Sequence, residues 1–241
     1  MSDPLAPLLE LEGVADAVKA AQDAVFAVHR HPANLRGGSA TAAEASVRAA
    51  RASAAIDGAD PEIPADAAVT DPILAGALRV AESLESLLPT WRRAPAQALA
   101  RLHVLAAADL VDDPETLGRP RAGAGPRLEL LSQLVTGATS VPGPLLAAVV
   151  HGELLALRPF GTADGVVARA AARLTMVATG VDPKSLSVPE VACFRRVVRY
   201  QEAAQGFASG EPEGVRGWLL FVCEAIEKGA REARGIAEAA G

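Results

Sequence analysis

Aromatic residues are scarce in this chain of 241 residues: they make up 3% of it, although half of the residues are apolar. Strands favour β-branched and aromatic side chains, whereas alanine and leucine favour helices. The composition therefore predicts an all-α protein and argues against a β-sandwich or a β-barrel. The length is sufficient for one large domain with a buried core.

Cysteine, long apolar runs and an excess of positive charge are also lacking. Cys193 and Cys223 are too few for a disulfide framework or a zinc site, so we expect them to pack in the core. No apolar run reaches the roughly 18 residues of a membrane-spanning helix, and the first residues lack the basic charge of a secretory signal. The net charge of −6 disfavours a nucleic-acid partner. We expect a cytoplasmic protein without a membrane or nucleic-acid partner.

Proline, glycine and capping residues divide the chain into a string of predicted helices. The expected N-caps are Asp71, which precedes Pro72, and two capping boxes, Thr41 with Glu44 and Ser187 with Glu190. An apolar stripe with a spacing of about 3.5 residues marks the first helix; its members are Val14, Val18, Ala21, Val25 and Val28. The helices are expected within residues 10–30, 41–58, 71–88, 95–110, 127–136, 144–157, 166–179, 187–206 and 212–238, with loops at 31–38, 58–66 and 112–126.

Residues 151–174, HGELLALRPFGTADGVVARAAARL, are the most informative segment. They predict two helices joined at Arg158–Asp164, with Phe160 buried as the anchor of the loop. A loop that opens onto a helix N-terminus presents free N–H groups and the positive end of a dipole, which suits an anion. On spacing alone, the same segment is also compatible with an ordinary joint between two helices.

This joint resembles the core motif of the Fic-domain (Fic/Doc) family, which reads His-Pro-Phe-x-acid-Gly-Asn-Gly-Arg-x-x-Arg. Four specified positions agree, namely Pro159, Phe160, Gly165 and Arg169. Five differ: Arg158 takes the His position, Thr162 the acidic position, Ala163 the first Gly position, Asp164 the Asn position and Val166 the first Arg position. The resemblance implies an all-α, Fic-like helical bundle with a short flap or loop region.

Other segments follow the order of the same family. His151 lies seven residues before Arg158, where family members often carry a His. Ser53, Asp57 and Gly58 in SAAIDG resemble an upstream inhibitory-helix motif, Ser/Thr-x-x-x-Glu-Gly, whose acid pairs with the second motif Arg. The resemblance therefore implies that Asp57 lies near Arg169, directly or through water. His103 lies on the helix expected over residues 95–110 and is expected in the core, and residues 117–125 resemble the substrate flap.

The simplest domain organisation is a single unit over residues 1–241. Residues 1–38 form an appended N-terminal helix in this interpretation, residues 41–220 the Fic-like core, and residues 221–241 the end of the C-terminal helix. No internal repeat or clear linker interrupts the sequence.

Family members transfer a nucleotide part, usually AMP from ATP, to a protein hydroxyl. The resemblance assigns the base to the motif His, Mg²⁺ binding to the acid, and the phosphates to the Asn, the glycine amides and both Arg. Here Arg158 stays protonated, Thr162 is no carboxylate, Asp164 is negative and Val166 is no cation. The motif is therefore interpreted as degenerate, with no intact catalytic residue and no metal site.

Two functions follow from this interpretation. The first is a pseudoenzyme that serves as an interaction or regulatory module with an unidentified protein partner and no cofactor. The alternative is an adenylyltransferase-like enzyme with altered chemistry that uses ATP with Mg²⁺ and transfers a nucleotide or phosphate-containing group to a protein hydroxyl. A homo-oligomer stays open. The basic cluster of Arg195, Arg196 and Arg199 is either a solvated helix face or a surface for an acidic partner.

Overall fold

The computed structural model describes residues 3–35, 38–63 and 68–239, and every regular element within them is helical. The loop predicted at 31–38 is wrong in part, because a short helix covers Pro32–Leu35. This predicted loop and the one at 58–66 extend into residues 36–37 and 64–67, which lie outside the described residues, as do residues 1–2 and 240–241. The helices are α1 (Val14–His29), α2 (Pro32–Leu35), α3 (Ser39–Ile56), α4 (Pro72–Trp91), α5 (Pro95–Ala107), α6 (Gly125–Gln133), α7 (Gly143–Leu157), α8 (Asp164–Ala178), α9 (Pro189–Phe194), α10 (Val197–Ser209) and α11 (Pro212–Ala239). The predicted all-α fold class is confirmed.

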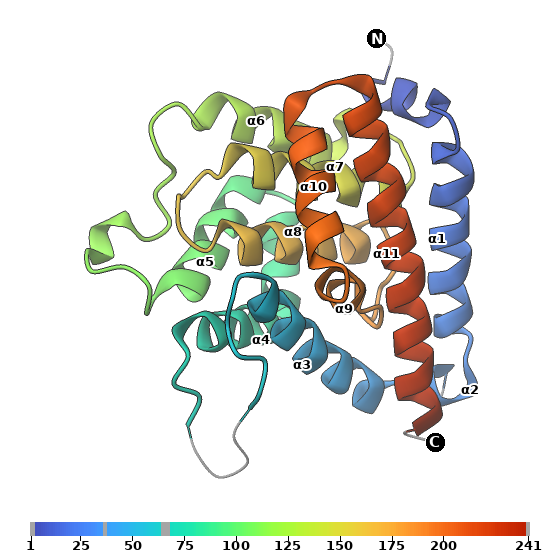
Figure 1. Ribbon diagram of the computed structural model, residues 1–241, viewed down its shortest axis with the longest axis horizontal. Helices are drawn as coiled ribbons and strands as arrows, with labels where there is room; N and C mark the ends of the chain where they lie inside the picture. Colours follow the sequence, from blue (N-terminus) through green and yellow to red (C-terminus); the bar gives the residue numbers. More distant parts are fainter. Residues whose placement is uncertain (1–2, 36–37, 64–67, 240–241) are drawn as a thin grey trace.

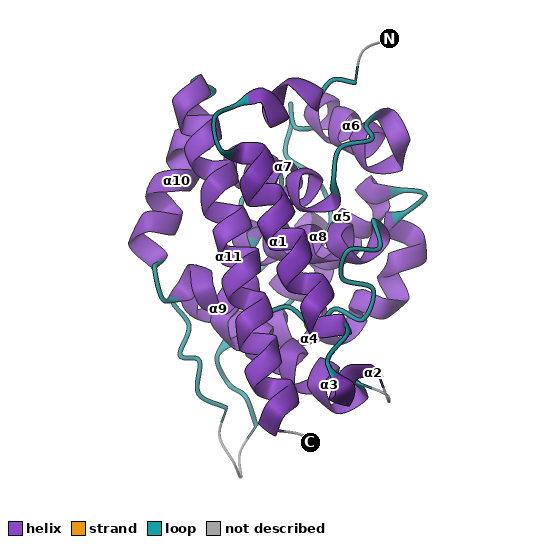
Figure 2. Cartoon of the chain, turned by 90° about the vertical axis from the view of Figure 1, so that its right-hand side faces the viewer, coloured by secondary structure: helices purple, strands orange, loops and turns teal. Residues whose placement is uncertain are grey.

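Helices α7 and α8 pack against each other at the centre of the bundle. Helices α4 and α5 cover α8, while α10 and α11 cover α7. The long C-terminal helix α11 lies along α1 at one side of the molecule, and α3 runs below α8 and α9 (Figures 1 and 2). This arrangement encloses the joint between α7 and α8 on several sides.

Helix α7 connects the two main apolar clusters. Leu145, Ala148 and Val149 belong to the cluster shared with α1, α10 and α11, whereas Val150 and Leu154 belong to the cluster shared with α4, α5 and α8. A helix that is apolar on all sides must be buried on all sides. The sequence of α7 thus explains its central position.

The predicted stripe of the first helix is confirmed. Its five members are the buried residues of α1, and they pack in the same cluster as α11. Residues spaced three or four apart fall on one face of a helix, so this stripe fixes the side of α1 that faces the bundle.

The predicted helix caps are only partly correct. Asp71 caps α4 by accepting hydrogen bonds from the amides of Ile73 and Leu74, as expected. The capping box of Thr41 with Glu44 is wrong, because α3 begins at Ser39 after Gly38, which has a φ of 75° and makes no side-chain cap.

The second predicted capping box is wrong as well. The hydroxyl of Ser187 donates to Asp182 at 2.5 Å, and Glu190 forms an ion pair with Arg173 at 2.8 Å. The helix expected over residues 187–206 is in fact two helices, α9 and α10, which separate at Arg195–Arg196.

In the described part of the chain, no helix combines the length and the apolar character that crossing a membrane requires.

Candidate functional site

The joint between α7 and α8 has the predicted form of two helices and a short loop. Helix α7 ends at Leu157, and α8 begins at Asp164. Arg158 (φ 46°) and Ala163 (φ 51°) lie at the two ends of the loop in the left-handed region, which is unfavourable for residues with a Cβ. This backbone conformation reverses the chain within six residues and points the N-terminus of α8 at the loop.

Phe160 anchors the loop, as predicted. Its side chain is 8% exposed, and its ring stacks on that of His103 with the centroids 4.3 Å apart. His103 lies in the core as expected, and its Nδ1 accepts a hydrogen bond from the amide of Gly118 at 2.9 Å. Burial lowers the pKa of His103, although the backbone of Thr162 opposes this effect. The stacked pair joins α5 to the loop.

The carboxylate of Asp164 closes the loop on itself. It accepts hydrogen bonds from the amides of Phe160 at 2.9 Å and Gly161 at 2.8 Å. Asp164 is buried; burial raises the pKa of its carboxyl, and the two amide hydrogen bonds oppose this effect. Two N–H groups of the loop therefore bind a side chain of the same chain.

Asp57 forms the predicted contact with Arg169, and the contact is direct rather than through water. The carboxylate and the guanidinium are 2.8 Å apart, although Asp is one methylene shorter than Glu. Ser53 contributes as well, because its hydroxyl and its carbonyl accept hydrogen bonds from Arg169 at 2.8 and 2.9 Å. Gly58 follows with a φ of 97° at the end of α3. The C-terminal end of α3 is thus fixed to α8.

Gly165 allows this close approach of α3 to α8. A Cβ at this position would lie 2.7 Å from each carboxylate oxygen of Asp57, which is shorter than any ordinary contact. The carboxylate of Asp57 therefore lies against the first turn of α8, where the helix dipole favours negative charge. Val166, at the position of the first motif Arg, is buried in the apolar core instead.

Two aromatic side chains extend the polar network inward from Arg169. The hydroxyl of Tyr200 lies 3.4 Å from Arg169 Nη1 and 2.8 Å from His151 Nε2. His151 packs edge-on against Trp218, and burial, followed by the charge of Arg169, lowers its pKa to about 3. Burial by itself lowers the pKa of Arg169, but Asp57 and Tyr200 outweigh this effect, so that the pKa is raised overall.

Arg121 connects the loop of residues 117–125 to the motif. Its amide donates to the carbonyl of Pro159 at 2.7 Å, and its guanidinium donates to the carbonyls of Leu157 and Arg158. Sequence reasoning identified this loop but missed both Arg121 and Tyr200. Nothing in the local sequence marks either residue, because their partners lie on distant parts of the chain.

An open cleft of about 700 Å³ lies over this joint. The exposed side chain of Arg158 lies at the cleft, and Gln201 and Gln205 of α10 also line it. Of the residues predicted from the motif, the lining includes Asp57, Arg158, Thr162, Asp164, Gly165 and Arg169. No group of three or more His, Cys, Asp or Glu residues that could hold a metal ion occurs in the described ranges.

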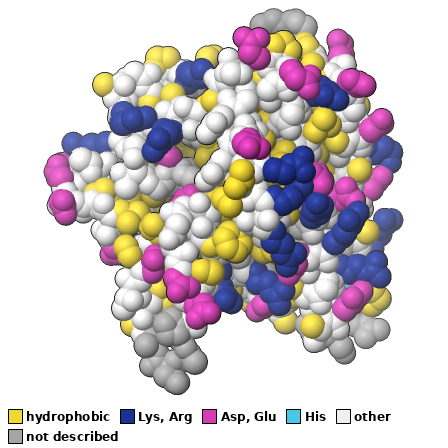
Figure 3. All heavy atoms as spheres, viewed as in Figure 1, with side chains coloured by type: hydrophobic (Ala, Val, Ile, Leu, Met, Phe, Trp, Pro, Cys, Tyr) yellow, Lys and Arg dark blue, Asp and Glu magenta, His cyan; other side chains and the backbone are white. Residues whose placement is uncertain are grey.

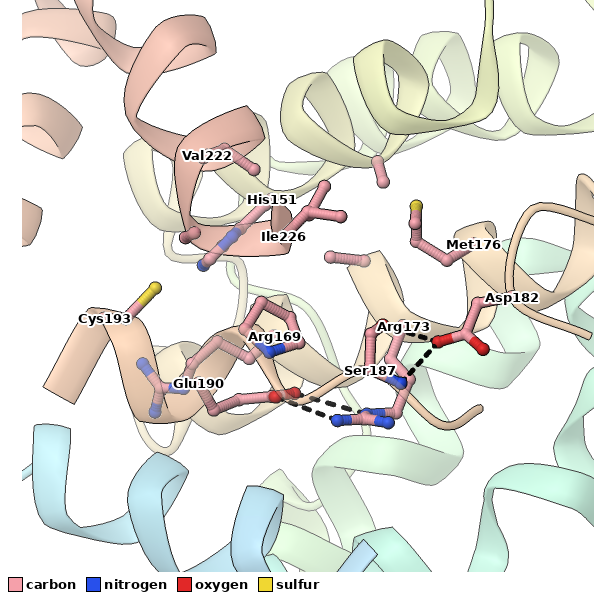
Figure 4. Close-up of a pocket in the computed structure, with 14 residues that line it drawn as sticks. His151, Arg169, Arg173, Met176, Asp182, Ser187, Glu190, Cys193, Val222 and Ile226 are labelled. Carbon is pink, nitrogen blue, oxygen red and sulfur yellow. Dashed lines mark hydrogen bonds and ion pairs between the residues drawn. The ribbon is translucent and has the colours of Figure 1, made fainter. Parts of the chain in front are cut away.

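A smaller, apolar cavity of about 40 Å³ lies behind Arg169 (Figure 4). The figure shows His151 and Arg169 on one side and the ion pair of Arg173 with Glu190 below. Cys193 also lines this cavity, and burial raises the pKa of its thiol to about 12. Both cysteines are free and buried, in agreement with a packing role.

Similarity to solved structures identifies the fold. No protein-family model matches the sequence, and no curated protein sequence matches it. Among solved structures, a Fic family protein from Desulfovibrio desulfuricans G20 superposes with a TM-score of 0.73 at 17% identity, over 93% of this chain and 74% of that chain. Fic-1 (residues 134–508) from C. elegans superposes with a TM-score of 0.72 at 14% identity, over 95% of this chain and 74% of that chain. The chain therefore has a Fic-like fold.

Proposed function

We propose that this chain is a Fic-fold pseudoenzyme that does not transfer AMP and serves as an interaction or regulatory module for a protein partner. The observation that carries the proposal is the occupation of the motif loop by the chain's own carboxylates. The carboxylate of Asp164 accepts hydrogen bonds from two loop amides, and that of Asp57 lies against the first turn of α8. In this proposal residues 1–241 act as one unit, with residues 41–220 as the Fic-like core.

The absence of a base at the motif position supports the proposal. A guanidinium stays protonated near neutral pH, so Arg158 cannot accept a proton from an attacking hydroxyl. His103 and His151 do not replace it, because neither histidine lines the cleft. His103 is stacked under Phe160, and His151 is bonded to Tyr200 in the core.

The charges around the N-terminus of α8 support it further. A phosphate at this end of the helix would meet the carboxylates of Asp57 and Asp164, and like charges repel. Thr162 provides no carboxylate for Mg²⁺ on the phosphates, and the buried Val166 provides no cation. Because base, metal and phosphate sites act as a unit, one surviving Arg at position 169 does not restore catalysis.

The size of the cleft favours the alternative, an enzyme with altered chemistry. Its volume of about 700 Å³ is large enough for a nucleotide with Mg²⁺, and Arg158 offers an exposed cation there. This enzyme would transfer a nucleotide or phosphate-containing group to a protein hydroxyl.

Labelled ATP distinguishes the two functions. The wild type and Asp57→Gly, which removes the carboxylate at α8, are incubated with α-labelled ATP and Mg²⁺ or Mn²⁺, and ATP and ADP binding is measured by calorimetry. We expect no labelled protein and weak or no binding of either nucleotide. Label that appears in either sample and disappears in Arg158→Ala, an exposed position that leaves the core intact, would overturn the proposal and establish the enzyme.

A further inference from the structure

A second concave surface lies away from the cleft, between α3, α9 and α11, and has a volume of about 470 Å³. We call it the basic groove and define it by its five cationic side chains: Arg48, Arg195, Arg196, Lys228 and Arg231. Glu232 is the single carboxylate that lines it. Figure 3 shows Lys and Arg side chains gathered over this part of the molecule, although the chain as a whole has a net charge of −6.

Acidic residues of α11 form ion pairs with cations of the basic groove. Glu232 accepts ion pairs from Arg48 at 2.7 Å and Arg195 at 3.2 Å. Glu224 likewise pairs with Arg196 at 2.7 Å and Lys228 at 2.8 Å. Each of these two carboxylates thus lies between two cations. The spacing of the cations therefore accommodates carboxylates.

Two of these cations, at the rim of the groove, remain available to a partner. The side chains of Arg195 and Arg231 are 67% and 69% exposed, and each has one ion pair, with Glu232 and Glu227 respectively. A guanidinium has five N–H donors, so one carboxylate leaves donors unused. These two side chains carry positive charge at the rim of the groove.

The floor of the basic groove is apolar and made of small residues. Val191, Ala192 and Gly235 line it, and a Cβ at Gly235 would point into open space. The adjoining junction of α9 and α10 exposes two large apolar side chains, Phe194 at 39% and Val198 at 62%. Aromatic, apolar and Arg side chains on one surface are typical of protein interfaces.

We propose that the basic groove binds an acidic segment of a partner protein. A Glu side chain fits this surface, because its methylenes can lie on the apolar floor while its carboxylate meets the forked donors of Arg195 or Arg231. A nucleic acid is disfavoured, since its backbone needs a basic field along its whole length, whereas a single Glu side chain needs only one exposed guanidinium. The proposal goes beyond the proposed function and is independent of what the cleft does.

The test uses a fluorescein-labelled Glu-rich peptide, a Gln-for-Glu version of the same peptide, and fluorescence anisotropy at low and high ionic strength. The full chain is compared with Arg195→Ala/Arg231→Ala. The matched control is Arg92→Ala/Arg101→Ala, which removes the same charge from two exposed positions outside the groove. A charge reversal, Arg231→Glu, serves as a second groove variant. Melting temperatures establish that the full chain and all three variants fold.

We expect the Glu peptide to bind saturably, the Gln peptide not to bind, and the groove variant to bind about tenfold more weakly while the control changes less than about twofold. High salt should weaken the binding. Equal binding by wild type and groove variant, or equal losses in both double variants, would overturn the proposal. So would tight binding of single-stranded RNA or anionic vesicles without binding of the Glu peptide.

Discussion

Phe160 holds the motif loop in place through the packing of its ring. We therefore expect that removing this ring strongly lowers the stability of the protein. Its buried ring stacks on His103 and fills space beneath the loop. We expect Phe160→Ala to lower the free energy of unfolding by about 3–5 kcal/mol, because transfer and cavity costs add. Urea denaturation measures this. Phe26→Ala, which truncates a ring that is 39% exposed, should cost less than about 1 kcal/mol; similar losses in the two variants would contradict the anchoring role.

Ala163 carries backbone strain at the first Gly position of the motif. A φ of 51° and a ψ of 16° cost a residue with a Cβ about 1–2 kcal/mol, whereas Gly adopts them freely. Gly also increases the conformational entropy of the unfolded chain, and this offsets part of the relieved strain. We therefore expect Ala163→Gly to raise the free energy of unfolding by about 0.5–1 kcal/mol. Thermal and urea unfolding both measure it.

The control for this strain is an alanine with ordinary helical geometry. Ala43 is exposed within α3, and Ala43→Gly should destabilise the protein by up to about 1 kcal/mol. Opposite signs at the two positions would demonstrate strain in the loop. Destabilisation by Ala163→Gly would exclude it.

At the scale of the elements, one ion pair joins α3 to α8. The side chain of Arg169 is 3% exposed and that of Asp57 is 27% exposed. Removing the carboxylate of Asp57 therefore leaves the buried guanidinium without its counterion. We expect Asp57→Ala to cost about 2–4 kcal/mol, somewhat below a fully buried pair because water reaches Asp57. Urea denaturation again measures the change. Asp60→Ala, an exposed control in the loop that follows α3, should change stability by less than about 0.5 kcal/mol.

A double-mutant cycle separates the ion pair from other effects of these side chains. Arg169 also donates to Ser53 and Tyr200, so Arg169→Ala removes more than one contact. If α3 is fixed through the pair, the coupling energy between Asp57→Ala and Arg169→Ala should exceed about 1 kcal/mol. Additive losses would show that the two side chains do not interact in solution.

The helices that could be predicted from the sequence are those whose signals are local. The stripe of α1 and the cap at Asp71 depend on residues within a few positions of each other, and both are confirmed. The two capping boxes failed for different reasons. Helix α3 begins before Thr41, at Ser39, whereas Ser187 and Glu190 bond to Asp182 and Arg173 instead of capping a helix.

The same distinction applies to the candidate site. The loop between α7 and α8 and the contact of Asp57 with Arg169 followed from the resemblance of the motifs, and the structure places both as expected. Tyr200 and Arg121 could not be found in this way. Each reaches the site only because the bundle folds α10 and the loop before α6 against it.

For the molecule as a whole, a buried histidine predicts sensitivity to acid. Burial and the charge of Arg169 lower the pKa of His151 to about 3, whereas the unfolded chain has a pKa of about 6.5 for this group. Between these values the unfolded state binds more protons than the native state, so stability falls as the pH falls from about 6.5 towards 3. One such group changes the free energy of unfolding by about 1.4 kcal/mol per pH unit.

The measurement is urea denaturation between pH 7 and about 4.5 for the wild type, His151→Gln and Tyr200→Phe. Gln can still bond to the hydroxyl of Tyr200 but does not titrate, so His151→Gln should reduce the slope of stability against pH by about 1.4 kcal/mol per unit. Tyr200→Phe should keep the slope, because burial rather than this hydrogen bond is the main cause of the lowered pKa. A slope that persists in His151→Gln would mean that other groups control the response to acid, and that His151 is protonated without loss of the fold.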